Sequence, residues 1–203
     1  MKENYQLLLD RELELIAASG KTPKLLLHSC CGPCSSYVLE YLSKYFEITI
    51  FYYNPNIYPM SEYFRRAANQ KLIIERMPFP HSVDLIVPDY TPEDFTKAAA
   101  GLENEPEGGA RCLECFKMRL DKTVQMASGG GFDYFTTTLS VSPHKNAQAI
   151  NEIGKEIAYK YCIKYLFSDF KKRDGYKRSI ELSEKHDIYR QDYCGCEFSM
   201  EKN

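Results

Sequence analysis

Short apolar runs alternate with longer amphipathic stretches along almost the whole chain. The first stretch, about residues 3–19, has leucines at 7, 8, 13 and 15 and Ile16 roughly on one side, which predicts a helix ending at Gly20. The later apolar runs are short and rich in β-branched or aromatic residues, which is typical of buried strands. Strands are predicted over residues 25–27, 47–53, 83–87, 132–138 and 163–167. Further helices are predicted over residues 35–45, 61–76, 91–100, 111–128, 142–160 and 177–185, with Ser61 and Thr91 as N-caps.

Strands that alternate with helices indicate a parallel sheet, so the predicted fold class is α/β with five parallel strands and helices on both faces. We expect a single domain over residues 1–203, which ends in a cysteine-bearing segment over about residues 188–203. In such sheets the functional crevice lies beyond the carboxyl ends of the strands. Two loops fall there: HSCCGPC, which starts at His28, and TTTLSVSPHKN, which starts at Thr136.

The N-terminus and the charge bear on the compartment and on the partners. The N-terminal stretch lacks the basic start and apolar block of a signal peptide, and no apolar run approaches the ~18 residues of a membrane span. We therefore predict a cytoplasmic protein without membrane contact. The formal net charge of −2 gives no global basic field, so a nucleic acid would have to be held by a local basic patch.

Eight cysteines are the unusual feature of the composition. Because a reducing cytosol disfavours structural disulfides, clustered cysteines there more often bind metal or perform redox chemistry. Two clusters begin predicted helices, where the backbone dipole stabilises thiolate, the form that binds metal. Cys162 stands alone beside a strand and is predicted to be an inert core residue. The other seven form three clusters: Cys30, Cys31 and Cys34; Cys112 and Cys115; Cys194 and Cys196.

The spacing of these cysteines leaves three kinds of site open. CGPC, residues 31–34, has the pattern of a thioredoxin-like redox pair, whereas CxxC with CxC is also typical of a structural zinc knuckle. Seven thiols exceed the four that one zinc ion or one cubane cluster needs, which favours an iron–sulfur site beside a metal with an open position. Adjacent side chains diverge on helices and strands, so Cys30 and Cys31 are expected to serve two neighbouring centres, or one ligand beside a free thiol.

Five motifs occur in an order that resembles the QueH-type epoxyqueuosine reductases: HSCCGPCS, FYYNPNIYPMSEYFRR, RCLECFKMRL, TTTLSVSPHKN and DYCGC. The resemblance runs from about Lys24 to Cys196. It implies a fold similar to the HUP or adenine-nucleotide α-hydrolase domains, with cysteines in place of the phosphate-gripping loop. It implies an oxidoreductase that converts epoxyqueuosine to queuosine at the tRNA wobble position, the last step of queuosine biosynthesis, without cobalamin. The implied partners are tRNA carrying epoxyqueuosine and an external electron donor.

The resemblance also implies a four-iron, four-sulfur cluster with a further metal ion, taken to be iron, close by. Some family members carry an acidic residue where this chain has Cys34. A cluster passes electrons one at a time, and a metal with an open position acts as a Lewis acid on the epoxide oxygen. The candidate catalytic residues are Cys30, Cys31 and Tyr58. Carried over by motif, the metal ligands are among Cys30, Cys31, Cys34, Cys112, Cys115, Cys194 and Cys196.

Residues around the cysteines are candidates for proton transfer and RNA binding. Tyr58, Tyr193 and His144 are candidate proton donors, whereas His28 is expected to be a satisfied core histidine. The aromatic residues Tyr52, Tyr53 and Tyr58 suit either packing or stacking on a splayed anticodon base. The basic stretches suit either a solvated helix start or tRNA phosphate contacts, and the candidate contacts are Arg65, Arg66, Lys171, Lys172, Arg173, Lys177 and Arg178.

Two other functions remain open on the sequence alone. One is a structural zinc or RNA-binding module that performs no chemistry. The other is a sulfur-transfer enzyme acting on tRNA, because related folds thiolate tRNA after adenylation. The chain has no SGGxDS-type nucleotide loop after its first strand, which argues against sulfur transfer.

Overall fold

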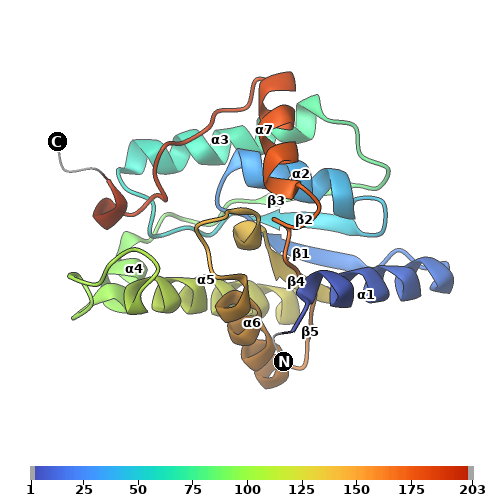
Figure 1. Cartoon of the computed structure of the whole chain (residues 1–203), viewed down its shortest axis with the longest axis horizontal. Helices are drawn as coiled ribbons and strands as arrows, with labels where there is room; N and C mark the ends of the chain where they lie inside the picture. The colour runs from blue at the N-terminus through green and yellow to red at the C-terminus, as the bar shows by residue number, and fades with distance from the viewer. Residues whose placement is uncertain (1–2, 201–203) are drawn as a thin grey trace.

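The computed structural model describes residues 3–200 (Figure 1). Its five strands form one parallel sheet in the order β3-β2-β1-β4-β5, which confirms the predicted α/β class. The strands are β1 (Lys24–His28), β2 (Glu47–Phe51), β3 (Val83–Ile86), β4 (Tyr134–Thr137) and β5 (Lys164–Tyr165). The helices are α1 (Tyr5–Ser19), α2 (Gly32–Leu42), α3 (Met60–Arg76), α4 (Pro92–Ala99), α5 (Ala110–Gly129), α6 (Ala147–Tyr161) and α7 (Gly175–Lys185), and the 3-10 turns are η1 (Thr138–Val141) and η2 (Glu197–Ser199).

The central strand β1 separates two hydrophobic cores. Leu25 and Leu27 pack with side chains of α1, α2 and α3, whereas Leu26 packs with α5 and α6 on the other face. All three leucines are fully buried, which explains why this strand is a continuous apolar run. Figure 1 shows α2, α3 and α7 on one side of the sheet and α4, α5 and α6 on the other. Within the described residues, no helix combines the length and the apolar character that crossing a membrane requires.

Several element boundaries differ from the prediction for local reasons. Helix α2 begins earlier, at Gly32, because Pro33 is tolerated in a first helical turn. Pro59, not Ser61, occupies the N-cap position of α3. Helix α6 begins only at Ala147, after the 3-10 turn η1, and the side chain of Asn146 caps it.

The buried face of α1 is also different from the predicted one. Tyr5, Leu9, Leu13 and Ile16 face the core. Leu7 and Leu15 are instead exposed. The spacing of the buried residues is three or four, as a helix with one buried face requires.

Helix α6 packs against β5 with no spare room at Gly154. A Cβ atom at this position would overlap the buried ring of Tyr165. We expect Gly154→Ala to lower the free energy of unfolding by about 1–2 kcal/mol, because the cost of overpacking exceeds the gain in helix propensity. Urea denaturation measures the change. Gly129→Ala at the end of α5 is the control, since nothing lies within 4 Å of its Cβ position, and equal midpoints for the two variants would contradict the prediction.

Candidate metal and active site

The order of the strands places a crevice between β1 and β4. Strands β2 and β3 extend the sheet on one side of β1, and β4 and β5 extend it on the other, so the connections switch faces at this point. A cavity of 1060 Å³ lies here between the loops that follow β1 and β4, the start of α7 and the C-terminal segment. Four cysteines line it: Cys30, Cys31, Cys34 and Cys194.

The loop after β1 brings three of these thiols together. Cys31 is the N-cap residue of α2 and Cys34 lies in its first turn. The Sγ atoms of Cys30 and Cys31 are 3.8 Å apart. The expected divergence of these two adjacent side chains is therefore wrong, because the pair occupies a strand-to-helix turn, to which neither regular geometry applies.

The surroundings of Cys30 favour its thiolate. Hydrogen bonds from Cys31 and Cys34 hold the pKa of the Cys30 thiol well below its ordinary value despite burial, and Lys145 and Arg119 add to the effect. The same contact with Cys30 raises the pKa of Cys31 to about 12, and that of Cys34 is raised as well. Of the three thiols in this loop, Cys30 is therefore the one whose surroundings most favour the thiolate form.

Helix α5 carries the second pair of cysteines. Cys115 is buried and packs in one cluster with Cys196 of the C-terminal segment. Burial raises the pKa of Cys112, and it raises the pKa of Cys115 to about 11, with the nearby charges of Cys194 and Cys196 adding to both shifts. The C-terminal cysteines therefore lie close to the pair on α5, although about 80 residues separate them in the sequence.

Two cations that were not predicted from the sequence, Arg119 and Lys145, lie among the thiols. The side chain of Arg119 is 2 % exposed, and its Nε donates to the carbonyl of Cys115 at 3.1 Å. Burial opposes its charge, but Cys115 and Cys30 outweigh burial and keep its pKa raised. Lys145 lines the cavity, and its Nζ donates to Sγ of Cys194 at 3.5 Å. For Arg119 the sequence did hold a signal. Its spacing from Cys112 and Cys115 places all three residues on one helix face.

The donor set fits a thiolate-bound metal centre by chemistry and location. Thiolates are the ligands of iron–sulfur clusters and of structural zinc, and buried cations offset the negative charge that such sites accumulate. Across residues 3–200, no group of three or more histidine, cysteine, aspartate or glutamate side chains is arranged as a ready-made ligand set. The fit therefore rests on the chemistry of the thiols that line the cavity or lie on α5 and the C-terminal segment, and on the two cations among them.

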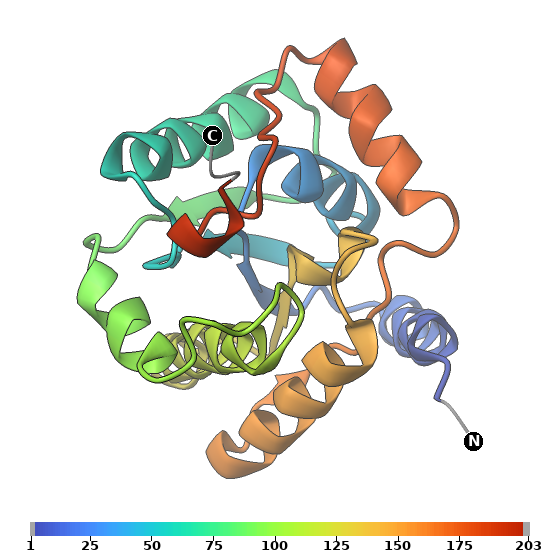
Figure 2. The same ribbon diagram turned by 60° about the vertical axis from the view of Figure 1, so that its left-hand side comes forward.

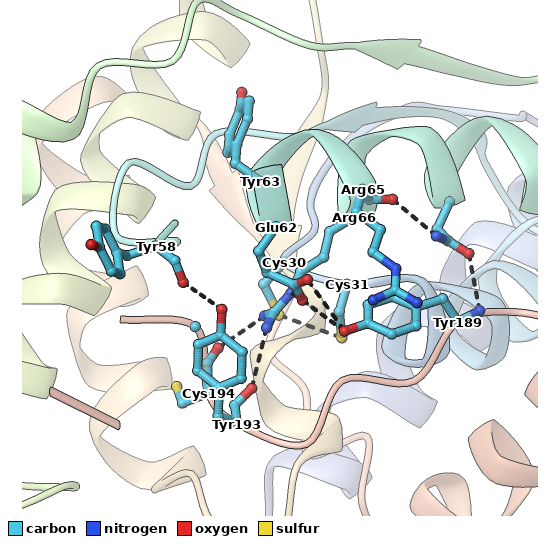
Figure 3. A network of polar contacts seen from close by, with 12 residues as sticks. Cys30, Cys31, Tyr58, Glu62, Tyr63, Arg65, Arg66, Tyr189, Tyr193 and Cys194 are labelled. Atoms are coloured by element: carbon cyan, nitrogen blue, oxygen red, sulfur yellow. Dashed lines mark hydrogen bonds and ion pairs between the residues drawn. The ribbon is translucent and has the colours of Figure 1, made fainter. Parts of the chain in front are cut away.

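The structure separates the three candidate proton donors. His144 and Tyr193 line the cavity, with His144 in the turn before α6 rather than in the helix as expected. Tyr58 is half exposed, and its ring points away from Cys30 and Cys31 (Figure 3). Its backbone carbonyl accepts a hydrogen bond from the hydroxyl of Tyr193.

His28 is a satisfied core histidine, as predicted. Its Nε2 donates to the carbonyl of Tyr53 at 3.2 Å, so its Nδ1 accepts from the hydroxyl of Thr137 at 2.8 Å. Burial, with a contribution from Arg119, lowers its pKa to about 4. The ring therefore stays neutral and joins the ends of β1 and β4 beneath the cysteine loop.

The predicted tRNA contacts fall into different environments. Arg66 is 1 % exposed and paired with Glu62, which conflicts with a role in binding phosphate. Arg65 is exposed, with its guanidinium 3.5 Å from the centre of the Tyr189 ring. Only Arg65 of this pair is therefore accessible to a nucleic acid.

The basic cluster around α7 is largely paired with carboxylates. Lys171 pairs with Asp169, Arg173 with Asp10, and Arg178 with Glu40 and Glu181. In the described part of the chain, Lys172 and Lys177 are exposed and form no ion pair within 4 Å. These two lysines are the unpaired charges of the cluster, and they lie close in the chain to Tyr176 and Ser179, which line the cavity.

The structure also bears on two other predictions. Tyr52 and Tyr53 are buried, and their hydroxyls donate to the carbonyl of Tyr63 and to Asp94, so they pack and are not available for stacking. Cys162 was expected in the core but is exposed, because it is the C-cap of α6 with a left-handed backbone.

The fold and the site together define an α/β protein with a thiol-lined cavity at the switch point of a parallel sheet. A family model described as "Epoxyqueuosine reductase QueH" matches residues 25–202, so the chain belongs to the QueH family. The protein named epoxyqueuosine reductase QueH from Streptococcus pyogenes is 46 % identical to this chain, and the match covers 98 % of this chain and 78 % of the relative. The protein of the same name from Staphylococcus epidermidis is 47 % identical, and the match covers 99 % of this chain and 86 % of the relative. The protein of the same name from Thermotoga maritima is 36 % identical, and the match covers 87 % of this chain and 90 % of the relative. The predicted family is confirmed.

Proposed function

We propose that this protein reduces epoxyqueuosine to queuosine in tRNA. The observation that carries the proposal is family membership over nearly the whole chain, and it is supported by a cavity that Cys30, Cys31, Cys34 and Cys194 line. Reducing the epoxide to an alkene breaks two C–O bonds, forms one C=C bond and releases the oxygen as water. The balance takes two electrons and two protons, and the electrons come from an external donor.

The seven clustered cysteines would hold a four-iron, four-sulfur cluster and a further metal ion, which we take to be iron. When bound, these centres supply single electrons and a Lewis acid for the epoxide oxygen. Among these cysteines, the Sγ atoms of Cys30 and Cys31 are 3.8 Å apart, and Cys34 and Cys194 line the same cavity. The buried guanidinium of Arg119 would offset the negative charge of these thiolates.

Side chains at the cavity wall would stabilise charge and donate protons during reduction of the nucleoside. Lys145 presents Nζ as a cationic donor beside Cys194, where it can stabilise the oxygen as negative charge develops there. His144 and Tyr193 lie at the same wall, and each can hold a proton for the departing oxygen. The exposed residues Arg65, Lys172 and Lys177 are the candidate contacts to tRNA phosphates.

Anaerobic purification from iron-supplied cells, followed by iron, zinc and sulfide analysis and an assay on epoxyqueuosine-tRNA, tests this proposal. We expect about four sulfides and more than four irons per chain, as a cubane with a further iron requires, and formation of queuosine. Zinc without sulfide, together with no turnover, would contradict it and favour a structural zinc module.

A further inference from the structure

Arg66 is a buried cation whose donors all point into the protein. It lies in α3, and its Nε donates to Oε1 of Glu62, one turn earlier, at 2.7 Å. A charge is buried at tolerable cost only where partners replace its water. The other hydrogen-bond partners of this guanidinium therefore indicate which part of the chain Arg66 holds in place.

Those partners lie 127 and 128 residues further along the chain. One Nη atom donates to the carbonyl of Cys194 at 3.1 Å, and the other donates to the carbonyl of Tyr193 at 3.3 Å. The guanidinium also lies 5.0 Å from the centre of the Tyr193 ring. Because these hydrogen bonds go to the backbone, they fix the path of the chain at Cys194 without using its thiol.

The same helix holds the beginning of the segment through Tyr189. The hydroxyl of Tyr189 donates to the Glu62 carboxylate at 3.1 and 3.2 Å, and its backbone N–H donates to Oδ1 of Asn69 at 3.0 Å. Arg65 covers the ring of Tyr189. Glu62 therefore joins Arg66 to Tyr189, as Figure 3 shows, and in both Figure 1 and Figure 2 the C-terminal segment runs beside α3.

The loop before α3 also binds the C-terminal segment, through backbone hydrogen bonds of Tyr58. The N–H of Tyr58 donates to the carbonyl of Gly195 at 2.8 Å, and the hydroxyl of Tyr193 donates back to the carbonyl of Tyr58. Gly195 has φ +134°, and a Cβ there would lie 3.1 Å from Nη1 of Arg66. A glycine between the two cysteines of CGC thus lets the guanidinium approach the chain.

We propose that Glu62, Arg66 and Tyr189 form a clamp that positions residues 189–196 over the thiol cavity. The clamp brings Cys194 to the cavity wall and Cys196 to the pair on α5. It acts on carbonyl oxygens, so the thiols remain free to bind metal. Glu62, Arg66 and Tyr189 are therefore positioning residues. The inference rests on the proposed function in one respect: the thiols that the clamp assembles are taken to be the reductase site.

Hydrogen exchange of the full-length protein, purified anaerobically, tests the clamp. In Arg66→Met we expect exchange of the 189–196 amides to rise about tenfold or more, because exchange follows local opening, whereas exchange in β1 stays unchanged. Iron and sulfide per chain should fall with it. The double variant E62M/R66M removes both charges together, leaves no orphaned carboxylate, and should show the same local release. Tyr189→Phe deletes only the hydroxyl and should give a smaller rise in the same amides.

Arg76→Met is the matched control. Arg76 ends the same helix and donates to the carbonyls of His186 and Asp187, but it is partly exposed and lies outside the cavity. Unchanged exchange over 189–196 in both Arg66 variants would overturn the clamp, as would an equal rise in β1, which marks a general loss of stability. If the segment is released as expected but the wild-type protein leaves epoxyqueuosine-tRNA unreduced, the clamp stands and the proposed function fails.

Discussion

Replacing Cys30 with serine is expected to lower turnover of epoxyqueuosine-tRNA by roughly 100-fold or more, and Cys31→Ser should do the same. The neighbouring thiols hold the pKa of Cys30 below its ordinary value, and its Sγ lies 3.8 Å from that of Cys31. A serine hydroxyl stays protonated near neutral pH and is a poor ligand for iron, so neither variant can replace the lost thiolate. Initial rates normalised to iron and sulfide content measure the effect.

Cys162→Ser is the control for both cysteine variants. Cys162 is exposed at the end of α6 and does not line the thiol cavity. Its replacement should leave both turnover and metal content unchanged. Full activity in both Cys30→Ser and Cys31→Ser would rule out our assignment of these two residues to the reacting site.

Replacing Lys145 with methionine is expected to lower kcat by about 100-fold, the usual effect of losing a preorganised donor at a developing negative charge. Its Nζ is 3.5 Å from Sγ of Cys194 at the cavity wall, and Cys194 and Cys30 keep its pKa raised in spite of burial. Lys145→Arg keeps the charge and the donors, so it should retain activity to within about tenfold of wild type. Single-turnover rates on epoxyqueuosine-tRNA separate this effect from changes in tRNA binding.

Lys155→Met is the matched control, because Lys155 is exposed on α6, which follows the same loop. It should leave kcat unchanged. A wild-type kcat in Lys145→Met, with normal iron and sulfide, would show that the cation does not act on the departing oxygen.

The sequence singled out the clustered cysteines as candidate ligands, but it did not predict how they are arranged. Clustered cysteines at predicted helix starts were visible in the sequence, because both the spacing and the start of a helix are local properties. The approach of Cys30 to Cys31 was not, since it depends on the turn between β1 and α2. Local pattern also placed Cys162 in the core, whereas helix α6 ends there and exposes it.

Arg66 illustrates the same limit for charged residues. In the sequence it is one of two adjacent arginines and suits a phosphate contact as well as Arg65 does. In the structure the two point in different directions, because neighbours on a helix lie about 100° apart. Arg65 reaches solvent, whereas Arg66 is buried against carbonyls that lie 127 and 128 residues away.

The sequence by itself determined the α/β class, the order of the elements and the family, and it singled out the clustered cysteines as candidate ligands. These follow from periodicity, from local turns and from motifs, each of which a short stretch of chain contains. Only the tertiary structure decided which cysteines share the cavity, that Lys145 and Arg119 lie among them, and that Arg66 faces inward. Those features depend on contacts between α3, α5, the loop after β4 and the C-terminal segment, and no local pattern encodes the burial and charge that such distant segments create together.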